Sequence, residues 1–142
     1  MNSKKTKIEL RNGDCLEEMK KIPDKSIDMI LCDLPYGTTS CVWDCVIDFE
    51  DLWEQYNRLI KCNGVIVLTA AQPFTTHLIK SNISDFRYCW YWVKSKVTGF
   101  ANAKKQPLRC VEDIVVFYKK MPTYNPQDLI RVDKKIKGNS CS

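Results

Sequence analysis

The stretch that decides the fold is Ile27-Asp28-Met29-Ile30-Leu31-Cys32, which runs directly into Asp33-Leu34-Pro35-Tyr36-Gly37. A mostly apolar run of six residues that ends in a polar, proline-containing segment is typical of a buried strand followed by a loop. Three further apolar, β-branched or aromatic runs predict more strands. They cover residues 65–68, 88–93 and 114–118.

Helical patterns separate these strands. Asp14 and Glu17 form a capping-box pattern that predicts a helix over residues 15–22. Apolar residues recur at helical spacing from 49 to 60, and residues 72–80 predict a helix entered through Pro73. Residues 7–10 are a short strand candidate. Alternating strands and helices predict an open α/β fold with a mostly parallel sheet covered on both faces.

Composition narrows the class of protein. The chain has 142 residues, 44% hydrophobic and 27% charged, which suits one globular domain with a net charge of +5. The basic residues 1–5 lead into no apolar signal core, and no apolar run is long enough to span a bilayer. The eight cysteines are therefore expected to be free thiols in a cytoplasmic protein without a membrane partner. The single histidine, His77, and the lack of two cysteine pairs at zinc-site spacing predict no metal site.

The segment after the first long strand carries the chemistry. In open α/β sheets, function gathers at the carboxyl ends of strands. The exocyclic amino group of a base can donate hydrogen bonds to the fixed carboxylate of Asp33 and to the adjacent carbonyl of Leu34. These hydrogen bonds would aim the lone pair of the amino nitrogen at a methyl donor. Pro35 restricts the backbone, and Tyr36 offers a face for an extruded base. The alternative is an ordinary turn. The sequence has no Pro-Cys dipeptide, which argues against methylation of a cytosine ring carbon.

Several blocks between residues 12 and 125, about four-fifths of the chain, resemble the amino-methyltransferases of prophage and restriction–modification systems. These blocks are 13–17, 32–39 with Trp43-Asp44, 64–68 running into 72–74, 92–94 with 99–100, 103–109, and 112–118. The family's usual tetrapeptide is Asp-Pro-Pro-Tyr, so Leu34 is a departure that keeps the carbonyl and loosens the backbone.

The resemblance implies a Rossmann-like methyltransferase fold that uses S-adenosylmethionine and acts on double-stranded DNA. It assigns the catalytic role to Asp33, Leu34, Pro35 and Tyr36. An aspartate in the first position favours the exocyclic amino group of adenine, and that of cytosine is the alternative. Related enzymes that methylate glutamine or RNA place a glycine loop ahead of the tetrapeptide, but only 32 residues precede Asp33 here. The order therefore resembles the permuted group, in which the catalytic block comes first.

In that group the cofactor lies on a Phe-x-Gly-x-Gly loop near the C-terminus, and none of the five glycines here has that spacing. We therefore expect a C-terminally truncated, partial fold without the cofactor-loop strands. Asp14, Cys15 and Asp33 are the remaining cofactor candidates, with helix capping as the alternative for Asp14. The chain alone is expected to bind S-adenosylmethionine weakly or not detectably. The catalytic strand becomes an exposed edge, which predicts a homodimer or a complementary C-terminal half as partner.

A basic stretch supplies the expected DNA contacts. The candidates are Lys94, Lys96, Asn102, Lys104, Lys105 and Arg109. Such a cluster gives affinity and salt dependence, and the alternative is a solvated basic loop. Tyr88, Trp90 and Trp92 are expected to pack under a helix layer. We assign residues 1–125 to the catalytic half and 126–142 to a basic, flexible tail. The alternative function is a non-catalytic remnant or a DNA-binding module.

Overall fold

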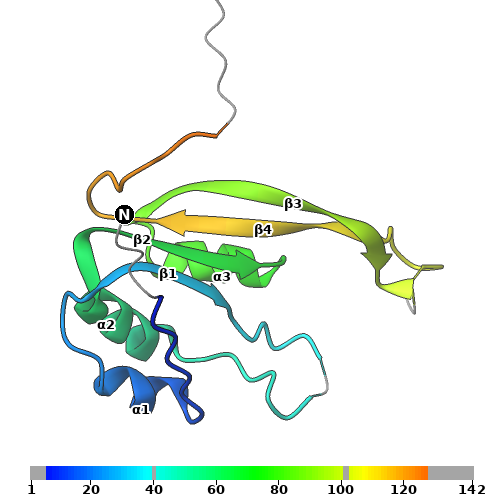
Figure 1. The fold of residues 1–142 in the computed structure, drawn as a ribbon. Coiled ribbons are helices and arrows are strands. Elements are labelled where there is room, and N and C mark those ends of the chain that lie inside the picture. The colour runs from blue at the N-terminus through cyan, green and yellow to red at the C-terminus, as the bar shows by residue number, and fades with distance from the viewer. Residues whose placement is uncertain (1–5, 40, 101–102, 128–142) are drawn as a thin grey trace, which may run out of the picture.

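The computed structural model describes residues 6–39, 41–100 and 103–127, and within these it forms one four-stranded sheet with three helices (Figure 1). The helices are α1 (Cys15–Lys20), α2 (Phe49–Leu59) and α3 (Phe74–Ser81). The strands are β1 (Ile27–Asp33), β2 (Ile60–Ala70), β3 (Phe86–Thr98) and β4 (Arg109–Phe117). The α/β class is confirmed.

The sheet has the order β1-β2-β4-β3. β1 and β2 are parallel, and β4 is antiparallel to both of its neighbours. Three strands therefore point the same way and β4 runs against them, so the sheet is mixed. The expectation of a mostly parallel sheet agrees with the common direction of β1, β2 and β3. Of the hydrogen-bonded strand pairs, however, only β1–β2 is parallel.

The hydrophobic core lies between the sheet and the pair α2 and α3. The apolar side chains of α2 recur three and four residues apart, so Leu52 and Tyr56 face the sheet and are buried. They meet Leu68 of β2 and Phe117 of β4, which are fully buried. The indole N–H of Trp53 donates to the Ser81 hydroxyl at 2.8 Å, which fastens α2 to the end of α3.

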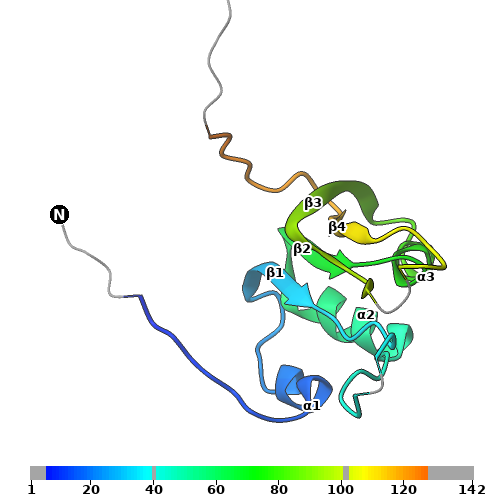
Figure 2. The ribbon, with the colours of Figure 1, turned by 90° about the vertical axis from the view of Figure 1, so that its right-hand side faces the viewer.

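The opposite face of the sheet carries no helix among the described residues (Figure 2). The expectation that Tyr88, Trp90 and Trp92 pack under helices is wrong, because each is 40–51% exposed. The cause is topological. The chain moves across the sheet in one direction from β1 to β2 to β3, and right-handed crossovers then place α2 and α3 on the same face.

β1 forms one edge of the sheet, as the sequence predicted. Its only partner among the described strands is β2, and Met29 and Leu31 on the helix-free face are 50% and 68% exposed. The predicted strand at residues 7–10 is wrong. Those residues have no regular structure, because no described strand lies beside them to complete their hydrogen bonds. Figure 2 shows this segment running away from the sheet.

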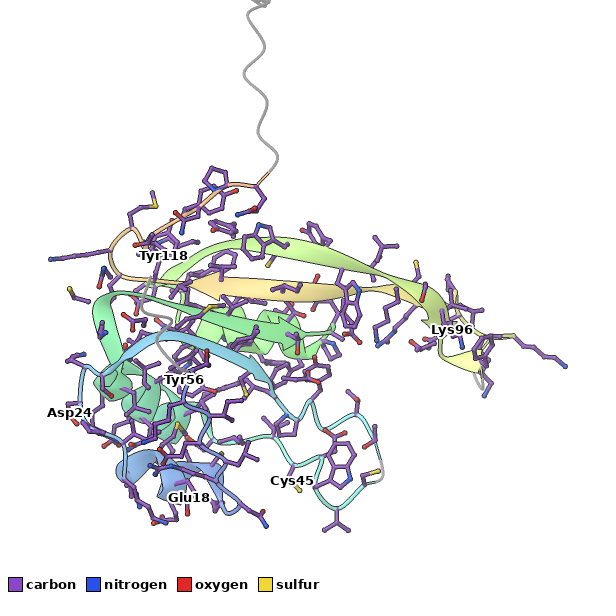
Figure 3. The ribbon with its side chains drawn as sticks, viewed as in Figure 1. Glu18, Asp24, Cys45, Tyr56, Lys96 and Tyr118 are labelled. Carbon is purple, nitrogen blue, oxygen red and sulfur yellow. The ribbon has the colours of Figure 1, made fainter. Side chains whose placement is uncertain are left out.

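The β3–β4 hairpin differs from the expected pattern of two short strands. β3 continues to Thr98 and pairs there with Arg109, so the described residues 99–100 and 103–108 lie in the connection between the two strands. Lys94 and Lys96 interrupt the apolar pattern, so the sequence did not predict that β3 extends beyond residue 93. The pair projects beyond the helices, with Lys96 near the far end (Figure 3).

Residues 118–127 leave β4 without regular structure, and Met121 and Tyr124 border a pocket of about 530 Å³ on the helix-free face. Tyr118 and Lys96 mark opposite ends of the hairpin (Figure 3). The tail expected at 126–142 lies almost wholly outside the described residues.

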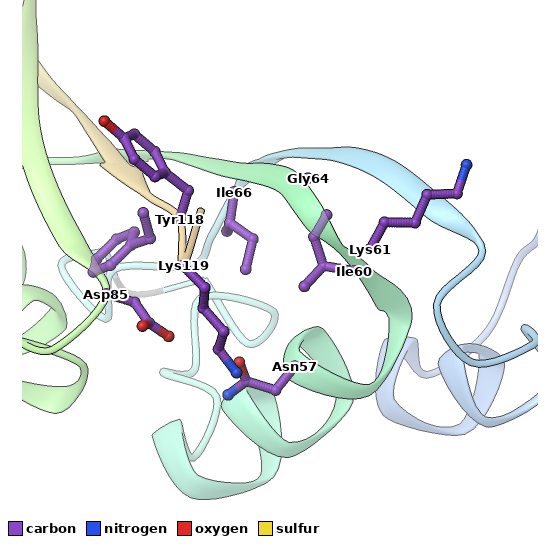
Figure 4. A pocket seen from close by; sticks show the side chains of 9 residues that line it. Asn57, Ile60, Lys61, Gly64, Ile66, Asp85, Tyr118 and Lys119 are labelled. Carbon is purple, nitrogen blue, oxygen red and sulfur yellow. The ribbon is translucent and has the colours of Figure 1, made fainter. Parts of the chain in front are cut away.

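A small cavity of about 10 Å³ lies beside Gly64, where β2 begins (Figure 4). The side-chain oxygen of Asn57 is buried here and has no hydrogen-bond partner among the described residues. The cavity has a volume at the lower limit for one water molecule. It lies at the opposite end of β2 from Asp33, so it does not belong to the candidate site.

Candidate functional site

The tetrapeptide begins where β1 ends. Asp33 is the last residue of β1 and pairs with Thr69 of β2, so the two side chains lie together at the carboxyl end of the parallel pair. The Tyr36 hydroxyl lies 2.9 Å from Asp33 Oδ1 and 2.8 Å from Thr69 Oγ1. The Thr69 hydroxyl also donates to Asp33 Oδ1. A strand end, a loop residue and a neighbouring strand thus form one hydrogen-bonded corner.

The burial of the Leu34 side chain explains why leucine can stand where the usual tetrapeptide has proline. Its side chain is 6% exposed and belongs to the hydrophobic core. A leucine at this position buries apolar area that a smaller ring would fill less well. Pro35 beside it is half-buried. The loop is therefore anchored through Leu34 into the core, in addition to the restriction that Pro35 imposes on the backbone.

The Tyr36 ring is held from one side. It stacks on Phe74 of α3 with 5.2 Å between ring centroids, and Phe74 contacts Phe49 at 5.8 Å. Burial raises the pKa of the Tyr36 hydroxyl above its ordinary range, and the neighbouring Asp33 carboxylate raises it further. The hydroxyl therefore stays protonated and remains a donor at neutral pH.

Asp44 organises the loop that follows Tyr36. Its buried carboxylate accepts hydrogen bonds from the backbone N–H groups of Gly37, Thr38 and Thr39 at 2.8, 2.8 and 2.6 Å. Hydrogen bonds from the Thr39 side chain and from these N–H groups lower the pKa of Asp44 to about 2. Gly37 has a φ of +66°, which a residue with a side chain adopts only at a cost.

The structure brings two of the predicted basic residues to this corner. Lys94 and Arg109 line a pocket of about 150 Å³ together with Tyr36 and Glu112. Lys94 is ion-paired with Glu112, and an Arg109 N–H donates to the Gln72 carbonyl at 3.3 Å. The positive charge of Lys94 is thus compensated by a carboxylate on the facing strand, a pairing that local sequence does not reveal.

The other predicted DNA contacts lie further along the hairpin. Lys96, Lys104 and Lys105 are exposed, and none of the three is ion-paired with a carboxylate among the described residues. Asn102 lies outside the described residues. Lys96 lies near the far end of the hairpin (Figure 3), whereas Arg109, which also has no carboxylate partner among the described residues, lines the pocket.

Asp14 and Cys15 begin α1 and are exposed. One Asp14 carboxylate oxygen accepts from the N–H groups of Leu16 and Glu17 at 2.9 and 3.2 Å, which confirms the Asp14 half of the predicted capping box. The Glu17 carboxylate pairs with Lys20 instead. Burial raises the pKa of the Cys32 thiol, and the nearby Cys15 contributes to the same shift.

Sequence reasoning missed Thr69, Glu112 and Phe74, and it gave Asp44 no role. Thr69 carried a usable signal, because it directly follows a predicted parallel strand and must end beside Asp33 if the two strands are neighbours. Glu112 and Phe74 depend on the hairpin register and on the placement of α3, which local patterns do not fix.

In the described ranges, no helix is long and apolar enough to cross a membrane. No group of three histidine, cysteine or acidic side chains in the same ranges is placed to hold a metal ion.

No protein-family model matches the sequence. The fold, however, matches solved structures. PvuII DNA methyltransferase, described as cytosine-N4-specific, aligns with a TM-score of 0.60 at 14% identity over 90% of this chain and 58% of its own. M1.HpyAVI bound to S-adenosylmethionine aligns at 0.57, with 15% identity, over 82% and 58%. TTHA0409 of Thermus thermophilus, assigned as a DNA modification methylase and solved with S-adenosyl-L-methionine, aligns at 0.53, with 18% identity, over 82% and 57%.

This chain therefore has the fold of S-adenosylmethionine-dependent methyltransferases that modify DNA. It spans just over half the length of each matched structure. The partial Rossmann-like fold expected from the sequence is confirmed at this level.

Proposed function

We propose that this chain forms the base-binding part of a DNA methyltransferase that acts on an exocyclic amino group. The observation that carries the proposal is the corner at the carboxyl ends of β1 and β2. There the carboxylate of Asp33 is held by two hydroxyls beside a half-buried aromatic ring. The matched folds, two of them solved with S-adenosylmethionine, support the same reading.

The residues of this corner have defined tasks. Asp33 Oδ2 accepts a hydrogen bond from the amino group of the base, which localises the nitrogen lone pair and directs it away from the ring. The carbonyl of Leu34 accepts the second amino hydrogen. The open side of Tyr36 stacks on the extruded base, while Phe74 supports the other side. When bound, S-adenosylmethionine supplies the methyl group, and the amino proton that is lost passes to Asp33.

We propose adenine as the base, since the tetrapeptide begins with aspartate. Cytosine is the alternative, because one matched fold is a cytosine-N4-specific enzyme. Titration of the chain with adenosine and with cytidine separates the two, and tighter binding of cytidine would reverse the assignment.

The cofactor fits this chain only in part. Asp14, Cys15 and Asp33 remain the candidates to contact it. The carboxylate of Asp14, however, is occupied in capping α1, and the described residues contain no Gly-x-Gly loop that would let a backbone approach the ligand.

The proposed function also requires a second polypeptide segment that covers the free edge of β1. The outer edge of β1 has unpaired backbone groups among the described strands, and the adjacent face exposes Met29 and Leu31. A segment with one strand and one covering helix satisfies both, and we propose that it also brings the cofactor loop. It can belong to a longer form of this chain or to a separate chain, and a second copy of this chain is the alternative.

The experiment is a calorimetric titration of the chain with S-adenosylmethionine, with and without double-stranded DNA. We expect salt-sensitive DNA binding and weak or undetectable cofactor binding until the complementary segment is added. Methyl transfer by the completed assembly, abolished in Asp33→Ala, supports the proposal. Transfer that survives Asp33→Ala would refute the role of the corner.

A second function is favoured by one observation, the lysines of the projecting hairpin that lack ion-pair partners in the described ranges. They support a DNA-binding module without catalysis. DNA binding that persists in an assembly that binds cofactor and transfers no methyl group would establish it.

A further inference from the structure

The Asp33 carboxylate is tethered on one oxygen only. Oδ1 contacts the hydroxyls of Tyr36 and Thr69, whereas Oδ2 accepts no hydrogen bond from any described residue. Asp33 itself is exposed and ends an edge strand. An exposed carboxylate at such a place normally rotates among its staggered conformers, so the two hydroxyls are what fix its direction.

The number of hydroxyl protons limits how Tyr36, Thr69 and Asp33 can hydrogen-bond to one another. Tyr36 and Thr69 each have one hydroxyl proton, yet the three oxygens make three mutual contacts. When Tyr36 donates to Thr69, the Thr69 proton is left for Asp33. When Tyr36 donates to Asp33, Thr69 can donate to the same carboxylate oxygen. Thr69 donates to the Asp33 carboxylate in both of these arrangements, whereas Tyr36 donates to it in the second only.

We infer that Thr69 is a positioning residue, which locks the Asp33 carboxylate so that Oδ2 alone is presented to the amino group of the base. This inference rests on the proposed function for its substrate, and on the hydrogen-bonded corner for its mechanism. Thr69 suits the task because the parallel register holds it opposite Asp33, and its β-branched side chain has few conformers.

A purely structural role for Thr69 makes different predictions. A threonine in a strand can matter only for its shape, and valine then replaces it without loss. Serine keeps the hydroxyl and loses the methyl group. Thr69→Val and Thr69→Ser are therefore a matched pair that separates the hydrogen bond from the packing.

The first measurement is the side-chain conformation of Asp33 in the labelled chain, read from three-bond NMR couplings. We expect one dominant conformer in the wild-type protein and in Thr69→Ser, and averaged couplings in Thr69→Val. Tyr36→Phe, which removes the other hydroxyl, should give partial averaging. An unchanged Asp33 conformer in Thr69→Val would overturn the inference, and so would averaging in Thr69→Ser equal to that in Thr69→Val.

The second measurement is NMR titration with adenosine and with purine riboside, which lacks the exocyclic amino group. A hydrogen bond to a charged group corresponds to a preference for adenosine of about 10-fold or more. We expect Thr69→Val to lose most of this preference and Thr69→Ser to keep it. Equal preference in Thr69→Val and the wild-type protein would overturn the inference.

The two measurements also separate the inference from the proposed function. If the wild-type protein binds both nucleosides equally, the base-binding proposal fails, and the coupling measurement still decides whether Thr69 positions Asp33.

Discussion

The hairpin allows a quantitative prediction about DNA binding. Lys96, Lys104 and Lys105 are exposed and without ion pairs in the described part of the chain, so each is available to one phosphate. Each neutralised phosphate contributes about 0.9 to the slope of log affinity against log salt, and three give about 2.7. A rise from about 50 to 200 mM salt should therefore weaken wild-type binding about 40-fold more than binding of the triple alanine variant.

The assay is fluorescence anisotropy with a mixed-sequence duplex at several salt concentrations. A double alanine variant at Lys119 and Lys120 is the matched control, because these exposed lysines follow the opposite end of β4. Its slope should equal that of the wild-type protein. A triple variant that keeps the wild-type slope, or a control that loses as much, would refute the assignment of the hairpin as the DNA-binding surface.

Three further predictions concern stability. Asp44 has a lowered pKa in the folded protein, so the stabilisation that its carboxylate gives is present above its ordinary pKa near 3.8 and is lost as pH falls toward about 2. Asp44→Asn should flatten this acid limb in urea unfolding, and an unchanged limb would contradict the account. Leu68→Ala should cost about 2–5 kcal/mol of unfolding free energy, whereas Leu31→Ala on the open face should change it by less than about 0.5 kcal/mol; equal losses would be evidence that the open face is covered. Gly64→Ala should cost about 1–3 kcal/mol because the added Cβ would lie 2.7 Å from Ile60 side-chain carbons, and thermal unfolding at the wild-type temperature would contradict this.

The sequence predicted the parts of the fold that depend on local pattern. The cap at Asp14, the amphipathic α2 and the strand that leads into Asp33 all follow from spacing within a few residues. The edge position of β1 followed from the family resemblance.

The features that were predicted wrongly or not at all depend on contacts between residues that are distant in the sequence. The helix layer expected over Trp90 fails because two right-handed crossovers in one direction cover one face only. The compensation of Lys94 by Glu112 depends on the hairpin register, and the strand expected at 7–10 depends on a partner that local sequence does not reveal. The same holds for Thr69 in the candidate site, since its role follows from the pairing of β1 with β2.

The central claim is that the Asp33 corner receives a base through its exocyclic amino group. The most direct test is to titrate the wild-type chain and Asp33→Ala with adenosine and with purine riboside, by NMR. We expect the wild-type chain to prefer adenosine by about 10-fold or more and Asp33→Ala to lose the preference. Equal binding of the two nucleosides by the wild-type chain, or a preference that survives in Asp33→Ala, would contradict the central claim.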